Sequence, residues 1–126
     1  RARAALAAAA ALPGQRATLI DRAEADARRL ATLDMRRAPA MAALIRAGVR
    51  RLTGDTAAAA DQLGTAAAAF DAMDMQLHAN AARRALGGLL GGDRGATLRA
   101  AAEAKISAQG VVDVDRLCAI FTPGMR

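Results

Sequence analysis

The sequence predicts an almost entirely helical fold, chiefly because of its composition and its apolar spacing. Of its 126 residues, 38 are Ala, the best helix former, whereas Trp and Tyr are absent and only two residues are Phe. Strands depend on β-branched and aromatic residues, so this composition excludes a β-sandwich or a β-barrel. Apolar residues also recur at spacings of three and four, as they do on one helix face. We therefore expect an all-α architecture of helices joined by short turns.

Proline and glycine mark the ends of the first three helices. The alanine-rich segment 2–11 ends at Leu12-Pro13-Gly14, because proline interrupts a helix but suits the first turn of the next one. The apolar periodicity predicts a long amphipathic helix from Gln15 to Met35. A third helix begins at Ala38-Pro39 and ends at Thr53-Gly54-Asp55. The N-terminal half should thus contain three helices.

Capping residues and glycines mark the remaining helices. Asp55 or Thr56 is suited to cap the helix over about 56–73, and the next helix covers about 76–90. These two helices meet at Asp74-Met75, a pair that favours a turn or a helix end. The second of them ends in the glycine cluster 87–92, which predicts a tight hairpin.

Capping aspartates and a glycine also mark the boundaries of the sixth and seventh helices. Asp93 is the predicted N-cap of a sixth helix that reaches Gln109, where Gly110 supplies a left-handed stop. Asp113 opens a short closing helix over 113–121. Through Leu117, Ile120 and Phe121, this helix should cover the apolar edge of the preceding hairpin.

The sequence is similar to itself at a displacement of 40 residues, and a third, looser copy begins at Leu90. Outside alanine, the identical pairs are Leu12/Leu52, Gly14/Gly54, Asp21/Asp61, Asp34/Asp74, Met35/Met75 and Gly48/Gly88. Repeats of this period indicate stacked units that are too small to bury their own apolar face. We predict one helical-repeat domain over 1–126, with hairpins at about 1–35, 38–73 and 76–109 and a capping helix at 113–121. In an open array, the helices 2–11 and 113–121 stay apart.

Two stretches of the chain resemble known proteins. The pattern Leu44-Ile45-Arg46-Ala47-Gly48, Gly54-Asp55, Ala59, Leu63, Ala66 and Phe70 resembles the tetratricopeptide repeat, in a divergent and longer form. The stretches Ala82 to Gly92, Ala104 to Val111 and Arg116 to Gly124 resemble the terminal repeat and closing helix of large GC-rich bacterial signalling proteins. The resemblance implies a right-handed α-α superhelix.

The same resemblance implies a context for the chain. In those signalling proteins, a Ser/Thr kinase domain and an ATPase module precede a tetratricopeptide-like array. We therefore expect a fragment of a larger cytoplasmic protein, with contacts to upstream domains as one option. None of the kinase or ATPase residues lies in this segment.

The residues that could carry chemistry favour structural roles. The glycines 87–92 are followed by Asp93 and Arg94 instead of the Lys and Ser or Thr of a phosphate-binding loop. His78 is the single histidine and Cys118 the single cysteine, so they cannot form a zinc site; we expect a half-buried histidine and a buried thiol. No nucleophile and base stand in a catalytic pattern. The sequence predicts no enzyme, no cofactor and no metal.

Arginine is the one feature that suggests binding. Residues 1–54 hold eleven Arg and four acids, a balance of +7, whereas residues 55–126 hold seven basic and eight acidic residues, a balance of −1. Arg46, Arg50 and Arg83 lie in first-of-pair helices, which line the concave groove in tetratricopeptide-like arrays. Because arginine pairs with carboxylates and phosphates, these three are the candidate partner-binding residues. A solvated helix face is the alternative.

We expect a non-catalytic protein-interaction or regulatory module that binds an acidic peptide or protein segment. Without aromatic residues for stacking or runs of lysine, binding to nucleic acid is disfavoured, although a basic nucleic-acid-binding helical domain stays open as an alternative. A self-associating helical bundle is the other alternative. No apolar run approaches the 18 residues that a membrane span needs, so no membrane partner is expected.

Overall fold

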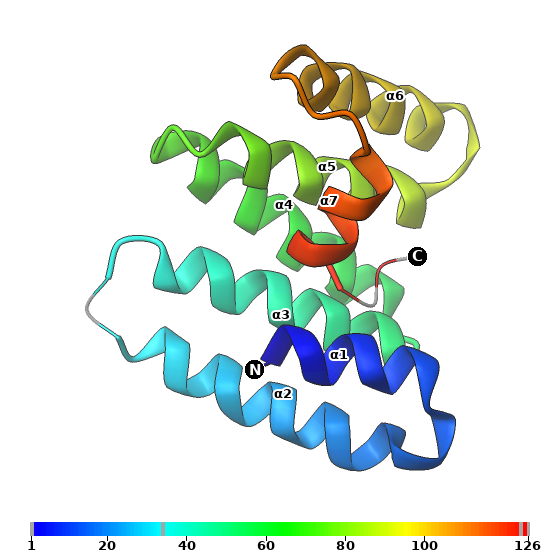
Figure 1. The fold of residues 1–126 in the computed structure, drawn as a ribbon. Coiled ribbons are helices and arrows are strands. Elements are labelled where there is room, and N and C mark those ends of the chain that lie inside the picture. Colours follow the sequence, from blue (N-terminus) through cyan, green and yellow to red (C-terminus); the bar gives the residue numbers. More distant parts are fainter. Residues whose placement is uncertain (1, 34, 124, 126) are drawn as a thin grey trace.

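The chain forms helices throughout, as predicted from its composition (Figure 1). The computed structural model describes residues 2–33, 35–123 and 125. Within these residues there are seven α-helices and one short 3-10 turn at Pro13–Gln15, and no strand. The helices are α1 (Ala2–Ala11), α2 (Arg16–Ala31), α3 (Ala38–Leu52), α4 (Thr56–Ala72), α5 (Gln76–Leu90), α6 (Gly92–Ala108) and α7 (Val114–Phe121).

Helices α2 to α6 stack in chain order, each against its neighbours in sequence (Figure 1). Helix α1 packs on α2 and α3, and α7 packs on α5 and α6. Both α1 and α7 lie on the near side of the stack in Figure 1, which we call the front face. Short turns between helices force this antiparallel zigzag.

One side-chain contact links the first and last helices, although they were expected to stay apart. The guanidinium of Arg3 in α1 lies 5.9 Å from the centre of the Phe121 ring at the end of α7. The reason is the direction of α7, which turns back over the front face instead of continuing the stack beyond α6 (Figure 1). The residues that follow α7 reach α3 as well, because the carbonyl oxygen of Pro123 lies beside Gly48.

Most helix ends lie where the turn residues predict them. The Asp55 carboxylate accepts a hydrogen bond of 3.1 Å from the amide of Ala58, and Asp113 accepts one of 3.0 Å from the amide of Arg116. These side chains satisfy amide groups that the first turn leaves unpaired. Gly110 ends α6 with φ at 88°, in the left-handed region predicted for it.

The predicted cap at Asp93 is wrong. Helix α6 begins at Gly92, its N-cap is Gly91, and Asp93 lies inside the first turn. Both glycines have positive φ, 64° and 60°. Their conformational freedom lets the chain turn at Gly91, so α6 begins before Asp93. Asp93 still places a negative charge at the positive end of the helix dipole.

The repeated Asp-Met pair is visible in one of its two copies. Asp74 has φ at 57° and lies in the turn between α4 and α5, as the sequence predicts. Its counterpart Asp34 lies outside the described residues. A positive φ is uncommon for a residue with a side chain, and aspartate is among the residues that tolerate it best.

The core consists of a few large side chains set among many alanines. The largest fully buried residues are Phe70, Leu6, Leu63, Ile106 and Asn80. Alanines and glycines elsewhere let the helices approach closely. A Cβ atom on Gly48 would lie 2.7 Å from Cδ1 of Leu6, so α1 and α3 touch through this glycine. None of the described helices combines the length and the apolarity needed to cross a membrane.

Helices α5 and α6 approach until their backbones touch. A Cβ atom on Gly87 would lie 2.6 Å from the carbonyl oxygen of Gly95 and 2.8 Å from the amide nitrogen of Arg99. Gly87 is therefore a buried packing residue inside α5. The tight hairpin predicted for the glycine cluster is made by its last two members, Gly91 and Gly92.

The closing helix covers the preceding hairpin with residues that differ in part from those predicted. Cys118 is buried at 2% exposure against Ala81 of α5 and Ile106 of α6, and Leu117 and Phe121 pack beside it. Ile120, predicted to contribute, is 55% exposed. Residues two apart in a helix differ in direction by about 200°, so the burial of Cys118 turns Ile120 outward.

Candidate functional site

The face of α3 that carries Arg46 and Arg50 follows from the position of Gly48. Gly48 points towards Leu6 of α1 and towards Pro123. Arg46 precedes it by two residues and Arg50 follows it by two, so both side chains start about 200° away from that direction. They therefore lie on the face of the stack opposite to α1, which we call the back face. Arg50 is exposed and Arg46 is half-buried.

Arg83 lies on the back face as well. It is two residues from Ala81, which is buried against α7, so it points away from the front face. Its guanidinium donates to both carboxylate oxygens of Asp71 in α4, with an Nη1 to Oδ1 distance of 3.2 Å. The hydrogen bond from Arg83 holds the pKa of Asp71 below its ordinary value.

The three candidate arginines thus share one face, but their electrostatic settings differ. The charge of Arg83 is compensated by Asp71. Arg46 and Arg50 belong to the segment 1–54, whose eleven Arg exceed its four acids. Even if every one of these acids formed an ion pair within the segment, seven arginines of the segment would need acids from elsewhere. Binding by these arginines stays a prediction.

The charge excess has a definite place in the fold. Residues 1–54 form α1, α2 and α3, which lie together at one end of the stack (Figure 1). We call this the basic end. An excess of positive charge on neighbouring helices produces a positive potential that attracts anionic partners.

At the opposite end, two arginines form a network of ion pairs. Arg84 of α5 donates through Nε to Glu103 of α6 at 2.8 Å, and its Nη2 atom donates to Asp115 of α7. Arg99 donates to the same Glu103 oxygen at 3.0 Å. The two arginines lower the pKa of the Glu103 carboxyl, with the hydrogen bond from Arg84 as the largest cause. This network ties α5, α6 and α7 together.

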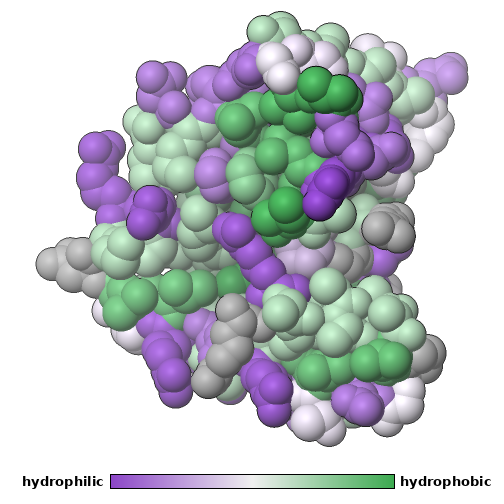
Figure 2. All heavy atoms as spheres, in the orientation of Figure 1, coloured by the Kyte–Doolittle hydropathy of each residue, from purple (hydrophilic) through white to green (hydrophobic). Residues whose placement is uncertain are grey.

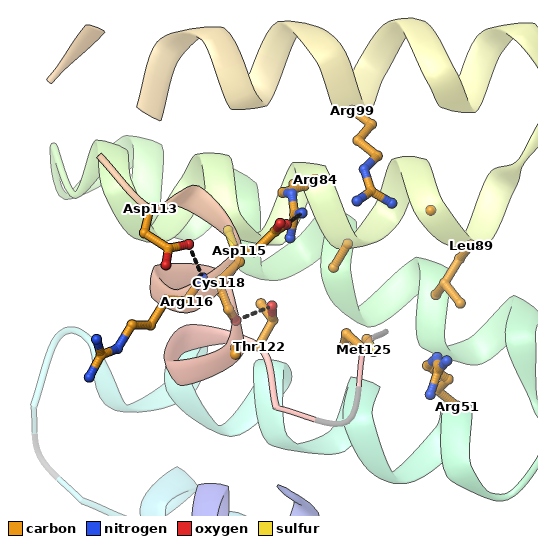
Figure 3. A pocket seen from close by; sticks show the side chains of 13 residues that line it. Arg51, Arg84, Leu89, Arg99, Asp113, Asp115, Arg116, Cys118, Thr122 and Met125 are labelled. Atoms are coloured by element: carbon orange, nitrogen blue, oxygen red, sulfur yellow. Dashed lines mark hydrogen bonds and ion pairs between the residues drawn. The ribbon is translucent and has the colours of Figure 1, made fainter. Parts of the chain in front are cut away.

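A groove of about 860 Å³ lies beside this network on the front face (Figure 3). Its apolar part includes Ala85, Leu89 and Met125. Arg84 and Asp115 point towards each other at the edge of the groove, whereas Arg116 points away from it (Figure 3). Figure 2 shows apolar side chains gathered over the adjoining α7 region, with hydrophilic residues around them.

His78 occupies the half-buried packing position predicted for it. Its ring stacks on Phe121 of α7 with centres 4.1 Å apart, and the centre of the Phe70 ring in α4 lies 5.1 Å away. Burial lowers the pKa of the imidazole, and the positive charges of Arg3 and Arg37 lower it further. His78 is therefore neutral at neutral pH and joins α4, α5 and α7.

Cys118 is a packing residue as well. Burial raises the pKa of its thiol, which opposes formation of the reactive thiolate. Its carbonyl oxygen accepts a hydrogen bond of 2.8 Å from the Thr122 hydroxyl (Figure 3). Among the described residues, no three His, Cys, Asp or Glu side chains gather as a metal centre would require.

Sequence reasoning selected Arg46, Arg50 and Arg83 but gave no indication of the ion pairs that Arg84 makes. Arg84 and Glu103 are 19 residues apart, and Arg84 and Asp115 are 31 apart. Periodicity within a helix carries no information on such contacts, which depend on how α5, α6 and α7 pack.

No family model, curated protein or solved structure matches this chain.

Proposed function

We propose that this chain is a non-catalytic protein-interaction module whose basic end binds an acidic segment of another protein. One observation carries the proposal: the charge excess of residues 1–54 lies on three helices that pack together at one end of the stack. Arginine is suited to this role because its guanidinium pairs with carboxylates in a bidentate geometry.

We further propose that the helices form a divergent tetratricopeptide-like right-handed superhelix in a larger cytoplasmic signalling protein, with a regulatory or scaffold role. Two features support this. Helices α2 to α6 contact chiefly their neighbours in sequence, and a glycine with positive φ makes the turn inside two successive hairpins, Gly54 between α3 and α4 and Gly91 between α5 and α6. Short units that pack only on their neighbours are typical of repeat arrays. Contacts with upstream domains of the same protein belong to this proposal.

Nucleic acid is the second candidate, favoured by the same positive charge. Proteins that bind single strands use exposed aromatic rings for stacking. The two phenylalanines of this chain instead flank His78, and Phe70 is fully buried. An acidic protein segment needs only the arginines, and it is the partner that we favour over nucleic acid and over self-association.

The test compares two anionic probes at two salt concentrations. A fluorescent peptide of alternating Glu and Ala and a duplex of 20 base pairs are titrated with the protein at 50 and 200 mM NaCl. We expect the peptide to bind more tightly than the duplex at the higher salt. For DNA binding, the logarithm of the association constant would instead fall with the logarithm of the salt concentration, with a slope of about −0.9 per neutralised phosphate.

Two variants localise the binding. Replacing both Arg46 and Arg50 with Gln should weaken peptide binding several-fold, since each exposed ion pair contributes about 0.5–1 kcal/mol. Arg83→Gln is the matched control, and we expect a smaller loss because Asp71 already compensates Arg83. Tighter and steeply salt-dependent DNA binding would overturn the proposal, as would failure to bind either probe. Analytical ultracentrifugation of the free protein checks self-association.

A further inference from the structure

Two turns that are 40 residues apart in sequence lie on the same side of the stack, on the left in Figure 1. One joins α2 to α3 and carries Met35, and the other joins α4 to α5 and carries Met73 and Met75. Between them is a shallow hollow of about 380 Å³, lined by these three methionines and by Arg36 and Arg37. We call it the methionine hollow.

The methionines make an apolar surface that can adapt to a bound side chain. Met73 and Met75 are partly buried against the core cluster that contains Phe70, so the floor of the hollow is supported by the fold. Met35 is 47% exposed at its rim. Methionine is unbranched and polarisable, and for this reason it occurs often at surfaces that accept apolar side chains of varied shape.

The two arginines set the charge of an acceptable partner. Arg36 and Arg37 are both exposed, and they belong to the basic end. Thioethers are also ligands for Cu(I), but two guanidinium groups in the same hollow oppose a cation. A partner with carboxylates beside an apolar group can pair with the arginines and pack against the methionines.

We propose that the methionine hollow is the anchor pocket for the acidic segment: it takes one large apolar side chain, and flanking Asp or Glu residues pair with Arg36 and Arg37. This inference rests on the proposed function and specifies the partner, a peptide with an aromatic or aliphatic residue set among acidic ones. Interfaces commonly use one such anchor in a pocket with a charged rim.

His78 provides an internal reporter of this binding. Arg37 is close enough to lower the pKa of His78, and this histidine is the only one in the chain. A carboxylate that pairs with Arg37 offsets that positive charge. The pKa of His78 should therefore rise when the peptide binds, which a titration of its ring protons by NMR measures directly.

The experiment uses two peptides of equal charge, Glu-Glu-Asp-Phe-Glu-Asp-Glu and the same sequence with Ala in place of Phe. We expect the Phe peptide to bind the protein about tenfold more tightly, since burial of a phenyl ring is worth at least that much. With methyl-labelled methionine, the Phe peptide should shift the Met35 and Met75 resonances and leave Met125, which lies in the front-face groove, unchanged.

Variants test the same pocket. Replacing both Met35 and Met75 with Ala should reduce the advantage of the Phe peptide to less than about twofold. Met125→Ala, the matched control, should retain it. Methyl shifts in the unaltered protein keep the test valid even if the double variant unfolds.

The outcomes separate this inference from the proposed function. Equal binding of both peptides, without shifts at Met35 and Met75, would overturn the anchor pocket and leave an acidic partner of the basic end in place. A shift at Met125 alone would place the anchor in the front-face groove and would equally overturn it. Failure of both peptides to bind would overturn both proposals.

Discussion

The two ends of the helical stack are held together by different means. At the α5–α7 end, Gly87 brings two helix backbones into contact, and Arg84 links α5 to both α6 and α7. At the basic end, α1 is held by one large side chain, Leu6, among small alanines. Residues 1–54 carry a net charge of +7, whereas residues 76–126 hold seven basic and four acidic residues, a net charge of +3, and Arg84 and Arg99 at that end are held in ion pairs.

This difference suggests a division of roles. A network whose charges already pair with one another has little affinity left for a partner, but it fixes the geometry of three helices. Uncompensated charges repel one another and reduce stability, and they are the ones that a partner can neutralise. In the proposed function, the α5–α7 end would serve as the scaffold and the basic end as the binding surface.

The largest effect should come from Leu6→Ala. Leu6 is fully buried and packs against Gly48, so its truncation leaves a cavity between α1 and α3. We expect a loss of about 2–5 kcal/mol in the free energy of unfolding, measured with urea. Leu33→Ala is the matched control, because Leu33 is 45% exposed, and it should change stability by less than about 0.5 kcal/mol. A loss below about 1 kcal/mol in Leu6→Ala would show that α1 is not held as described.

A second comparison uses one substitution at two glycines. Gly87→Ala should cost about 1–3 kcal/mol, because the new methyl group meets backbone atoms of α6 that cannot move aside. Gly64→Ala in α4 should instead stabilise the protein by about 0.5–1 kcal/mol, because open space surrounds that position and alanine restricts the unfolded chain. Thermal unfolding of both variants checks the sign. Equal effects at the two positions would contradict the close approach of α5 and α6.

The contrast between the ends also shows what the sequence can predict. Helices and turns follow from local signals, as at Pro13, Gly110 and the capping residue Asp113, so six of the seven helices lie close to their expected ranges, whereas α2 ends at Ala31, before the predicted Met35. Contacts between helices that are distant in sequence cannot be predicted from these local signals. The role of Gly87 depends on Gly95 eight positions later, and a glycine signals only that some special geometry is present.

The candidate site also has features that the sequence predicts and features that only the packing of the helices determines. Arg46, Arg50 and Arg83 were selected by charge and by their position in first-of-pair helices, and the sequence contains both signals. It does not show that Asp71 pairs with Arg83, because that contact joins two helices across a turn. It also does not show that Met35 lies beside Met75. The 40-residue identity made these positions equivalent, but only packing makes them neighbours.

A smaller effect should follow from Arg84→Met, which keeps the aliphatic packing and removes the charge. Its partners Glu103 and Asp115 are partly solvated, so we expect a loss of about 1 kcal/mol in stability. The more sensitive measurement is the alkylation rate of Cys118, whose thiol α7 keeps buried. Looser docking of α7 should raise this rate several-fold. Arg28→Met, at an exposed position of α2, is the control, and an unchanged rate in Arg84→Met would show that the network does not hold α7.

The smallest effect should be a pH dependence that His78 introduces where α7 meets α4 and α5. Burial, with the charges of Arg3 and Arg37, lowers the pKa of His78 in the folded protein below its ordinary value of 6.5. Above pH 6.5 both the folded and the unfolded chain carry a neutral imidazole, and the full stability is present. As the pH falls below 6.5, the unfolded chain binds the proton first, so the free energy of unfolding decreases until the folded pKa is passed. Asp71 and Glu103 titrate below this window because arginines lower their pKa values.

Urea unfolding at pH 7.5, 6.5 and 5.5 and constant ionic strength measures the decrease in the free energy of unfolding. The variant His78→Phe, which keeps an aromatic ring beside Phe70 and Phe121, should remove most of this decrease. Stability that rises with acidification, or an equal decrease in the variant, would show that His78 is not the group responsible.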